Sequence, residues 1–247
     1  VTEILKFHFC PQLYYFNSIL GLQGINERSR IEPDYAEGED GSNLKDDELP
    51  GHELGNIVHR VFKNYHFPEN KLKEYIKKEL RVFGLETNQD SINRVANWVN
   101  SFYNSDVGKE VVSSKLQKRE TSFIFNYKHN LIRGQIDLFY FNNEGLLKII
   151  DYKANDITID EIPEKVQYYQ LQMQLYARAL ETIYSTEVDE TILYFLVPDK
   201  PVVVNTTEEA CRELDSTLDN FFTAHRDGGF KKLSEQRCKW CEYEGIC

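Results

Sequence analysis

The spacing of apolar residues along this chain predicts a series of amphipathic helices. Between Pro50 and Phe62, apolar side chains recur every three or four positions, as on one face of a helix. Comparable patterns predict helices over Ile4–Gly21, Lys71–Phe83, Ser91–Tyr103, Glu164–Tyr184 and Glu208–His225. Thr206 or Thr207 is expected to cap the last of these helices.

Shorter segments combine β-branched and aromatic residues in the manner of strands. Ile136–Phe141 and Leu146–Tyr152 flank the turn-forming run Asn142–Gly145, so together they predict a β-hairpin. Thr191–Val197 predicts another strand, and Pro201–Val204 is expected to extend it. Helices and strands in this order predict an α/β domain with helical additions.

Charged residues on the predicted hairpin suggest a site. Side chains alternate along a strand, so Asp151 and Lys153 share one face and Tyr152 points to the other. Asp137 is expected to lie across the hairpin from Asp151, and two facing carboxylates repel unless a cation neutralises them. Hard divalent ions such as Mg²⁺ and Mn²⁺ favour such oxygen ligands. A metal site and a solvated surface hairpin with an Asp/Lys pair both remain open at this point.

Two predicted helices carry further candidates. His59 follows Gly55 by one turn, and a glycine inside a helix costs about 1 kcal/mol relative to alanine unless a close neighbour requires it. Gln172 and Tyr176 lie one turn apart on the helix predicted over 164–184. A lone helical histidine is usually structural, and an aromatic stripe is usually a packed core face. Each motif is therefore weak by itself.

In their order along the chain, these motifs resemble those of the PD-(D/E)XK nucleases of the RecB-like branch. That branch includes the nuclease domains of bacterial helicase-nucleases, AddB-like ones among them, and the CRISPR-adaptation exonucleases. Its members show G-x-x-x-H on a helix, G-x-(I/V)-D and (D/E)-x-K on strands, and Q-x-x-x-Y on a later helix. The corresponding segments here are Gly55–His59, Gly134–Asp137, Asp151–Lys153 and Gln172–Tyr176, which together span about 120 residues. The family also has a glutamate on the preceding strand, for which Glu120 is the best candidate.

The resemblance implies a fold and a metal site. The fold is a restriction-endonuclease-like core, a mixed central sheet flanked by helices, in which Thr191–Val197 is a parallel and central strand. His59, Asp137, Asp151 and the main-chain carbonyl of Tyr152 would bind Mg²⁺ or Mn²⁺. A divalent ion so bound lowers the pKa of water and neutralises charge on the phosphate.

The remaining motif residues are expected to act on the substrate. By the same resemblance, Lys153 would orient the attacking hydroxide or stabilise the phosphorane-like transition state. Glu120 would contact a metal-bound water or a second metal ion, and the choice between one ion and two stays open. Gln172 and Tyr176 are expected to position the DNA strand near the scissile phosphate, Tyr176 by stacking or by a phosphate contact.

Cysteine spacing supplies a separate signal. Cys238, Cys241 and Cys247 form C-x2-C-x5-C at the C-terminus, and Cys10 lies near the N-terminus. Spacing alone leaves zinc or a disulfide open. The layout is similar to the four-cysteine staple of several RecB-like nucleases, in which thiolates from both ends hold a structural [4Fe-4S] cluster that joins the two terminal segments. Cys211 is expected to be a buried cysteine outside this set.

The formal net charge of −11 opposes binding to a polyanion. Much of it lies in a predicted acidic loop over 32–51, where eight acidic residues and one lysine give −7 and leave −4 for the rest of the chain. Two basic runs are candidates either for phosphate contacts or for solvated faces. They comprise Lys71, Lys73, Lys77, Lys78 and Arg81, and Lys115, Lys118 and Arg119.

We expect one nuclease domain over 1–247. It would contain an N-terminal helical segment (1–31), the acidic loop (32–51), a core (52–206) with a helical insertion (69–115), and a C-terminal helix with the cysteine tail (207–247). Because the chain starts at Val1 and has one methionine, Met173, it is expected to be part of a longer polypeptide.

The sequence thus predicts a divalent-metal-dependent DNA nuclease, exonucleolytic on single-stranded ends, fused to or associated with a helicase of DNA repair or recombination. A standalone CRISPR-adaptation-type exonuclease, a non-catalytic DNA-binding or scaffolding module and a zinc-binding regulator are the alternatives. No apolar run reaches membrane-spanning length. A cytoplasmic, bacterial-type location without a membrane partner is therefore expected.

Overall fold

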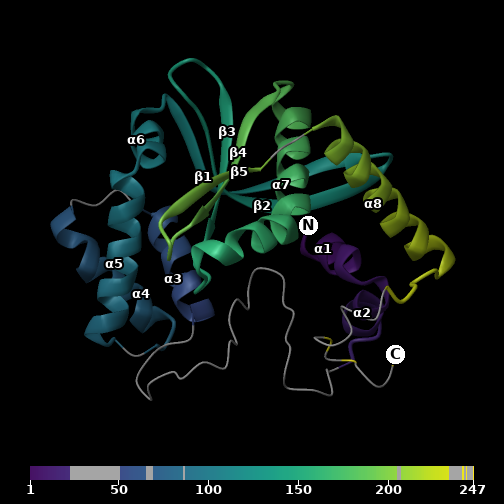
Figure 1. The fold of residues 1–247 in the computed structure, drawn as a ribbon, viewed down its shortest axis with the longest axis horizontal. Coiled ribbons are helices and arrows are strands. Elements are labelled where there is room, and N and C mark those ends of the chain that lie inside the picture. The colour runs from purple at the N-terminus through teal and green to yellow at the C-terminus, as the bar shows by residue number, and fades with distance from the viewer. Residues whose placement is uncertain are drawn as a thin grey trace. The chain divides into compact units, whose positions relative to one another are not determined.

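The computed structural model describes residues 1–22, 51–64, 69–85, 87–204, 207–233, 241, 243 and 247 (Figure 1). These residues belong to two compact units, one formed by Val1–Glu39 with Thr206–Cys247 and the other by Asp40–Asn205. The predicted acidic loop lies outside the described residues up to Pro50, as does Cys238. The expected single domain over 1–247 stays a prediction.

The larger unit is built on a five-stranded sheet in the order β1-β2-β3-β4-β5. Its strands are β1 (Leu116–Tyr127), β2 (Asn130–Phe141), β3 (Leu147–Lys153), β4 (Val188–Phe195) and β5 (Lys200–Val204). The pair β3 and β4 is parallel and the other pairs are antiparallel, which confirms the predicted mixed sheet and its parallel strand. The expectation that Pro201–Val204 extends the preceding strand is wrong, because the chain turns back after Phe195 and β5 pairs antiparallel with β4.

The predicted hairpin is confirmed as β2 and β3. Asn142 forms its turn, since its side-chain oxygen accepts hydrogen bonds from the backbone N–H groups of Glu144 (3.0 Å) and Leu146 (2.9 Å). Leu138 pairs with Ile150 in this ladder, so the adjacent residues Asp137 and Asp151 lie at the same end of the hairpin. Nearly all of β3 is buried, as expected of an internal strand covered on both faces.

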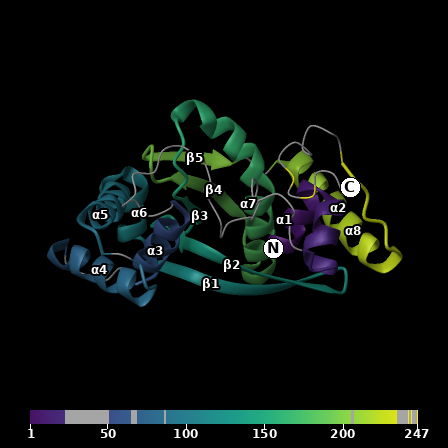
Figure 2. The ribbon, with the colours of Figure 1, turned by 90° about the horizontal axis from the view of Figure 1, so that it is seen from below.

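Helices cover the two faces of this sheet. The helices α3 (Gly51–Lys63), α4 (Leu72–Val82), α5 (Gln89–Asn104) and α6 (Asp106–Ser113) group on one side, and α7 (Ile162–Tyr184) connects β3 to β4 (Figure 2). Short 3-10 turns at Glu69–Lys71 and Ile159–Glu161 precede α4 and α7. The predicted helices over 50–62, 71–83, 91–103 and 164–184 are confirmed to within two residues at each end.

Strand alternation decides which helix each side chain meets. Tyr140 and Tyr152 belong to the core formed with α3, α4, α5 and α6. Phe139, the neighbour of Tyr140, instead lies edge-on to Tyr184 of α7, with ring centroids 5.5 Å apart. By the same alternation, Asp151 and Lys153 face α7 while Tyr152 faces α3.

The smaller unit contains α1 (Thr2–Phe9), α2 (Pro11–Tyr14), a π-helical turn (Tyr15–Ile19) and α8 (Glu208–Asp227). The helical segment expected over Ile4–Gly21 is broken at Cys10, whose backbone is extended, and Pro11 starts a new helix. The predicted cap of α8 is confirmed at Thr207, whose hydroxyl accepts a hydrogen bond from the Ala210 N–H (3.3 Å).

Aromatic side chains hold the smaller unit together. Phe7 lies edge-on to Phe221 with ring centroids 5.3 Å apart, and the Tyr14 hydroxyl lies 2.9 Å from His225 Nε2. Burial, with Glu3 nearby, raises the pKa of Tyr14 to about 12, so its hydroxyl stays protonated at neutral pH. Across the described residues of both units, no helix is long and apolar enough to cross a membrane.

Candidate metal centre

Three side chains from three elements of the larger unit converge on one point. His59 comes from α3, Glu120 from β1 and Asp137 from β2. His59 Nδ1 lies 3.4 Å from Glu120 Oε1 and 3.4 Å from Asp137 Oδ1, and the ligand atoms of all three residues lie within 4.8 Å of one another. The His59 side chain is 31% exposed and each carboxylate 12%, so the group is accessible from solvent.

An unusual backbone conformation places Glu120 in this group. Its φ of 45° lies in the left-handed region, although the ladder runs without a register shift from Arg119 opposite Leu138 to Thr121 opposite Ile136. A non-glycine residue held there costs about 1–3 kcal/mol, and such strain persists where the surroundings impose it. Gln135 of β2 is one such restraint, because its Nε2 donates a hydrogen bond to Glu120 Oε2.

The spacing of the three ligand atoms fits a hard divalent cation. With metal–oxygen bonds of about 2.1 Å, neighbouring ligands of an octahedral ion lie about 3 Å apart and opposite ligands about 4.2 Å apart. The two distances of 3.4 Å fall between these values. Two carboxylates and an imidazole are donors that Mg²⁺ and Mn²⁺ accept. His59, Glu120 and Asp137 can therefore hold one ion between them.

The pKa shifts of His59 and Asp137 in the metal-free group also fit a cation site. Burial disfavours a charged imidazole, yet Asp137 and Glu120 raise the pKa of His59 well above its usual value. Burial also works against a charged Asp137, but His59, Lys153 and the Tyr152 N–H lower the pKa of this carboxyl. A proton on His59 thus balances part of the negative charge that a metal ion would otherwise neutralise.

A second charged cluster faces α7 and is buried. Lys153 Nζ lies 3.0 Å from Asp151 Oδ2 and donates to Gln172 Oε1 (3.3 Å). Gln172 Nε2 in turn donates to Asp151 Oδ1 (3.3 Å) and to the Tyr176 hydroxyl (2.8 Å). Asp151 is 2% and Lys153 3% exposed. Asp151, expected among the metal ligands, thus lies outside the group of His59, Glu120 and Asp137 and is paired with Lys153.

Tyr152 connects the two clusters through its backbone. Its N–H donates a hydrogen bond to Asp137 Oδ2 (2.9 Å). Because the N–H and C=O of one extended residue point to the same side of a strand, the Tyr152 carbonyl faces the side on which Asp137 lies. Its ring points the other way and stacks on Phe62, with centroids 4.1 Å apart. The role of the Tyr152 carbonyl as a metal ligand stays a prediction.

Two contacts of this site were missed from the sequence. The ring centroid of Tyr169 lies 3.9 Å from Lys153 Nζ, in the arrangement of a cation–π interaction. Tyr169 precedes Gln172 by three positions on α7, so helical spacing alone placed both on one face. Gln135, within the G-x-(I/V)-D segment, contacts Glu120. No sequence signal singles it out, since the pairing register is needed to see this contact.

The basic residues before Glu120 divide between surface and interior. The guanidinium of Arg119 donates hydrogen bonds to the Phe62 carbonyl (2.7 Å), the Tyr103 hydroxyl (2.6 Å) and Gln117 Oε1 (2.7 Å). Arg119 therefore ties β1 to α3 and α5. Lys118 is exposed and keeps its predicted alternatives of a phosphate contact or a solvated face.

The fold and the site define a candidate phosphodiesterase of the restriction-endonuclease type, and sequence comparison gives the family. The chain belongs to the PD-(D/E)XK nuclease superfamily, whose sequence profile matches residues 1–247. The mixed sheet with its flanking helices is the fold predicted for that family.

Curated relatives are the A-type subunits of the ATP-dependent helicase/nuclease from several bacteria. The protein from Clostridium novyi (strain NT) is 25% identical over 181 residues, which cover 65% of this chain and 14% of the relative. The protein from Alkaliphilus oremlandii (strain OhILAs) is 29% identical over 168 residues, which cover 61% of this chain and 14% of the relative. The chain thus spans a small part of these relatives, and they are of the A type, whereas the motifs suggested a B-like protein.

Among solved structures, a putative exonuclease from Eubacterium rectale is similar to this chain. The two share 11% sequence identity with a TM-score of 0.49, over 84% of this chain and 79% of the other.

Proposed function

We propose that this chain is the nuclease module of a DNA helicase-nuclease and hydrolyses phosphodiester bonds with Mg²⁺ or Mn²⁺, from single-stranded ends. The observation that carries the proposal is the convergence of His59, Glu120 and Asp137 beside the Asp151–Lys153 pair. The names of the curated relatives, which contain both helicase and nuclease, support the assignment to such an enzyme.

Different side chains are proposed to bind the metal ion and to contact the phosphate. His59, Glu120 and Asp137 would hold the ion, with the Tyr152 carbonyl on the same side. A divalent ion bound there supplies water of lowered pKa and neutralises charge on the phosphate. Asp151, the remaining predicted ligand, would have to exchange part of its contact with Lys153 for the ion. Lys153 would place its positive charge against the phosphate.

Gln172 and Tyr176 are proposed to act beside the Asp151–Lys153 pair. Both are buried, and Gln172 contacts Asp151 and Lys153. We propose that Gln172 holds Asp151 and Lys153 in position and that Tyr176 contacts the DNA strand next to Lys153.

The experiment is degradation of end-labelled single-stranded DNA with Mg²⁺ or Mn²⁺. Wild type is compared with Asp137→Asn and Lys153→Arg, and Asp160→Asn is the control because Asp160 is an exposed carboxylate. We expect wild type and the control to cleave the DNA. The cleavage rate should fall about 100-fold or more in both site variants, and no cleavage should occur in EDTA. A folded wild type that cleaves no DNA with either ion would contradict the proposal and favour the scaffolding module.

We also propose that Cys10, Cys238, Cys241 and Cys247 hold a [4Fe-4S] cluster. Support comes from the smaller unit, where Cys10 is 8% exposed and packs with Tyr243 and Cys241 in one cluster. The Tyr243 hydroxyl donates to the Leu22 carbonyl (2.7 Å), which ties the cysteine tail to the N-terminal segment. Cys10 and Cys241 would supply two thiolates there and Cys238 and Cys247 the other two, which together would be a ligand set for iron or zinc.

Metal content tests the cluster independently of nuclease activity. Protein purified anaerobically is analysed for iron, acid-labile sulfide and zinc, and Cys241→Ser is compared with Cys211→Ser. Cys211 is the control because it lies on α8, outside the proposed ligand set. It is half-buried, whereas the sequence predicted a buried cysteine. We expect about four iron atoms per chain, lost in Cys241→Ser and kept in Cys211→Ser. Zinc in place of iron, or equal iron in both variants, would overturn the assignment.

A further inference from the structure

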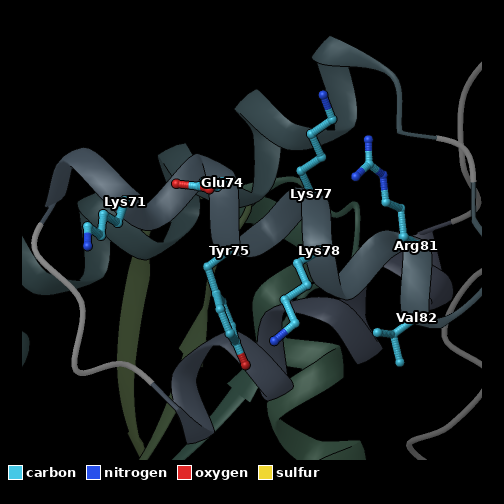
Figure 3. Close-up of a pocket in the computed structure, with 7 residues that line it drawn as sticks. All are labelled: Lys71, Glu74, Tyr75, Lys77, Lys78, Arg81 and Val82. Atoms are coloured by element: carbon cyan, nitrogen blue, oxygen red, sulfur yellow. The ribbon is translucent and has the colours of Figure 1, made fainter.

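A basic hollow lies on the exposed side of α4, away from the metal centre residues. It has a volume of about 770 Å³ and is lined by Lys71, Glu74, Tyr75, Lys77, Lys78, Arg81 and Val82. Figure 3 shows Lys71 at one end of this segment and Lys77, Lys78 and Arg81 toward the other, with Lys77 and Lys78 pointing in different directions. Four cations and one carboxylate leave a local charge of +3 on a chain whose formal net charge is −11.

The amphipathic pattern of α4 explains how these cations come together. Leu72, Ile76 and Leu80 are buried in the core of the larger unit. Lys71 of the preceding turn and the exposed α4 residues Lys77, Lys78 and Arg81 carry the positive charges that line the hollow, and we name these four residues the α4 basic face. Within the part of the chain that the structure describes, no acidic side chain forms an ion pair with any of these four cations.

One acidic residue of α4 is turned away from this face and fixes the helix in place. Glu79 is 4% exposed, and its Oε2 lies 2.7 Å from Arg60 Nε of α3. Arg60 directly follows His59 in the chain, so the ion pair joins α4 to the helix that carries the candidate metal ligand. The α4 basic face and the metal centre therefore belong to one packed framework.

The dimensions and chemistry of the α4 basic face suit a nucleic-acid backbone. From Lys71 to Arg81 the chain advances by ten positions, about 15 Å along a helix, so the positive charges are spread over a length that more than one phosphate of a strand can span. Ammonium and guanidinium groups contact phosphates without regard to base sequence. Tyr75 and Val82 add apolar surface to the hollow, as strand-binding grooves often do.

We infer that the α4 basic face binds the phosphate backbone of the DNA strand outside the catalytic centre. This inference rests on the proposed function and adds to it a second contact with the substrate. On a chain whose overall charge repels DNA, a local cationic surface supplies the attraction that retains the strand while its end is cleaved.

Binding to fluorescent single-stranded DNA in EDTA tests the inference without cleavage. Lys78→Gln/Arg81→Gln is compared with Lys109→Gln/Lys200→Gln, which removes the same charge from exposed positions on α6 and β5. We expect about tenfold weaker binding by the α4 variant at low salt, with the slope of log Kd against log salt shallower by about 1.4 for two lost phosphate contacts. The control should bind as wild type does, and thermal unfolding should be unchanged in both.

The possible outcomes separate this inference from the proposed function. Equal weakening in both double variants, or an unchanged salt slope in the α4 variant, would overturn the role of the α4 basic face even if the protein cleaves DNA. Loss of binding confined to the α4 variant would support it even if cleavage needs a partner helicase. In a cleavage assay the α4 variant should raise KM with kcat unchanged, which a damaged catalytic centre would not do.

Discussion

The two charged clusters of the larger unit differ in how their charges are balanced. His59, Glu120 and Asp137 place two carboxylates around one imidazole at the edge of solvent, whereas Asp151 and Lys153 form a buried ion pair. The first cluster has excess negative charge that a cation from solution can neutralise. The second is neutral as folded and depends on its own partners. Substitutions in the two clusters should therefore have different effects, on stability for the buried pair and on metal binding for the solvent-facing group.

The largest expected effect comes from breaking the buried pair. Lys153→Met keeps the length of the side chain but leaves Asp151 charged, buried and without its ammonium partner. We expect it to lower the free energy of unfolding by about 3–5 kcal/mol in urea titrations. Adding Asp151→Asn should recover much of this loss. If Lys153→Met lowers the free energy of unfolding by less than about 1 kcal/mol, Asp151 and Lys153 do not form a buried ion pair that each needs.

The solvent-facing cluster should respond to metal instead. Mn²⁺ at about 100 times its Kd is expected to raise the free energy of unfolding of wild type by about 2.7 kcal/mol. Glu120→Gln should lose most of this gain, because it removes one carboxylate of the group. Glu144→Gln, at an exposed turn residue, should retain it. Equal stabilisation of both variants would remove Glu120 from the site.

The same cluster should show a pH dependence that metal reverses. The pKa of His59 is higher in the folded protein than its unfolded value near 6.5. Below pH 6.5 the charge on His59 therefore makes its full contribution to the stability of the metal-free fold. This contribution is lost as pH rises through the folded pKa. Metal must displace the proton, so Mn²⁺ affinity should rise over the same range. Urea unfolding in EDTA and calorimetric Mn²⁺ titration measure the two trends, and His59→Gln should abolish both.

A smaller effect is expected from the aromatic partner of the buried lysine. Tyr169→Leu removes the ring face beside Lys153 Nζ and should lower kcat about tenfold, equivalent to about 1.4 kcal/mol. Tyr169→Phe keeps the ring and should retain kcat, although it loses the hydroxyl contact with Asn155 (3.4 Å). Similar kcat values for the two variants would show that the ring does not position Lys153.

The smallest effect is expected at Gly55, one helical turn before His59 on α3. A Cβ on Gly55 would meet Ala154 Cβ at 3.7 Å, an ordinary contact, so no close neighbour requires a glycine here. Gly55→Ala should stabilise the helix by up to about 1 kcal/mol and leave metal binding intact. Gly108→Ala is the contrast, because a Cβ there would collide with the Phe102 carbonyl and should destabilise the protein. Thermal unfolding separates the two.

Sequence reasoning succeeded where local pattern determines structure. Helical spacing located α3 and α7, and turn chemistry at Asn142 located the hairpin that brings Asp137 and Asp151 to one end. Motif order also singled out His59, Asp137 and Glu120, which the structure brings close together, while their roles at a metal stay a prediction.

Details that depend on tertiary packing could not be predicted. The left-handed backbone of Glu120 and its restraint by Gln135 arise from cross-strand contacts. The pairing of Asp151 with Lys153 rather than with His59 depends on how deeply α7 buries that face. Pro201–Val204 was misassigned because strand propensity does not say whether the chain continues or turns back.

The most direct test is an anomalous difference map from crystals soaked in Mn²⁺. A peak between His59, Glu120 and Asp137, within about 2.2 Å of a ligand atom from each, is the result predicted here. A peak coordinated by Asp151 and not by His59, or no peak with both clusters intact, would contradict the central claim that the solvent-facing cluster is the metal site.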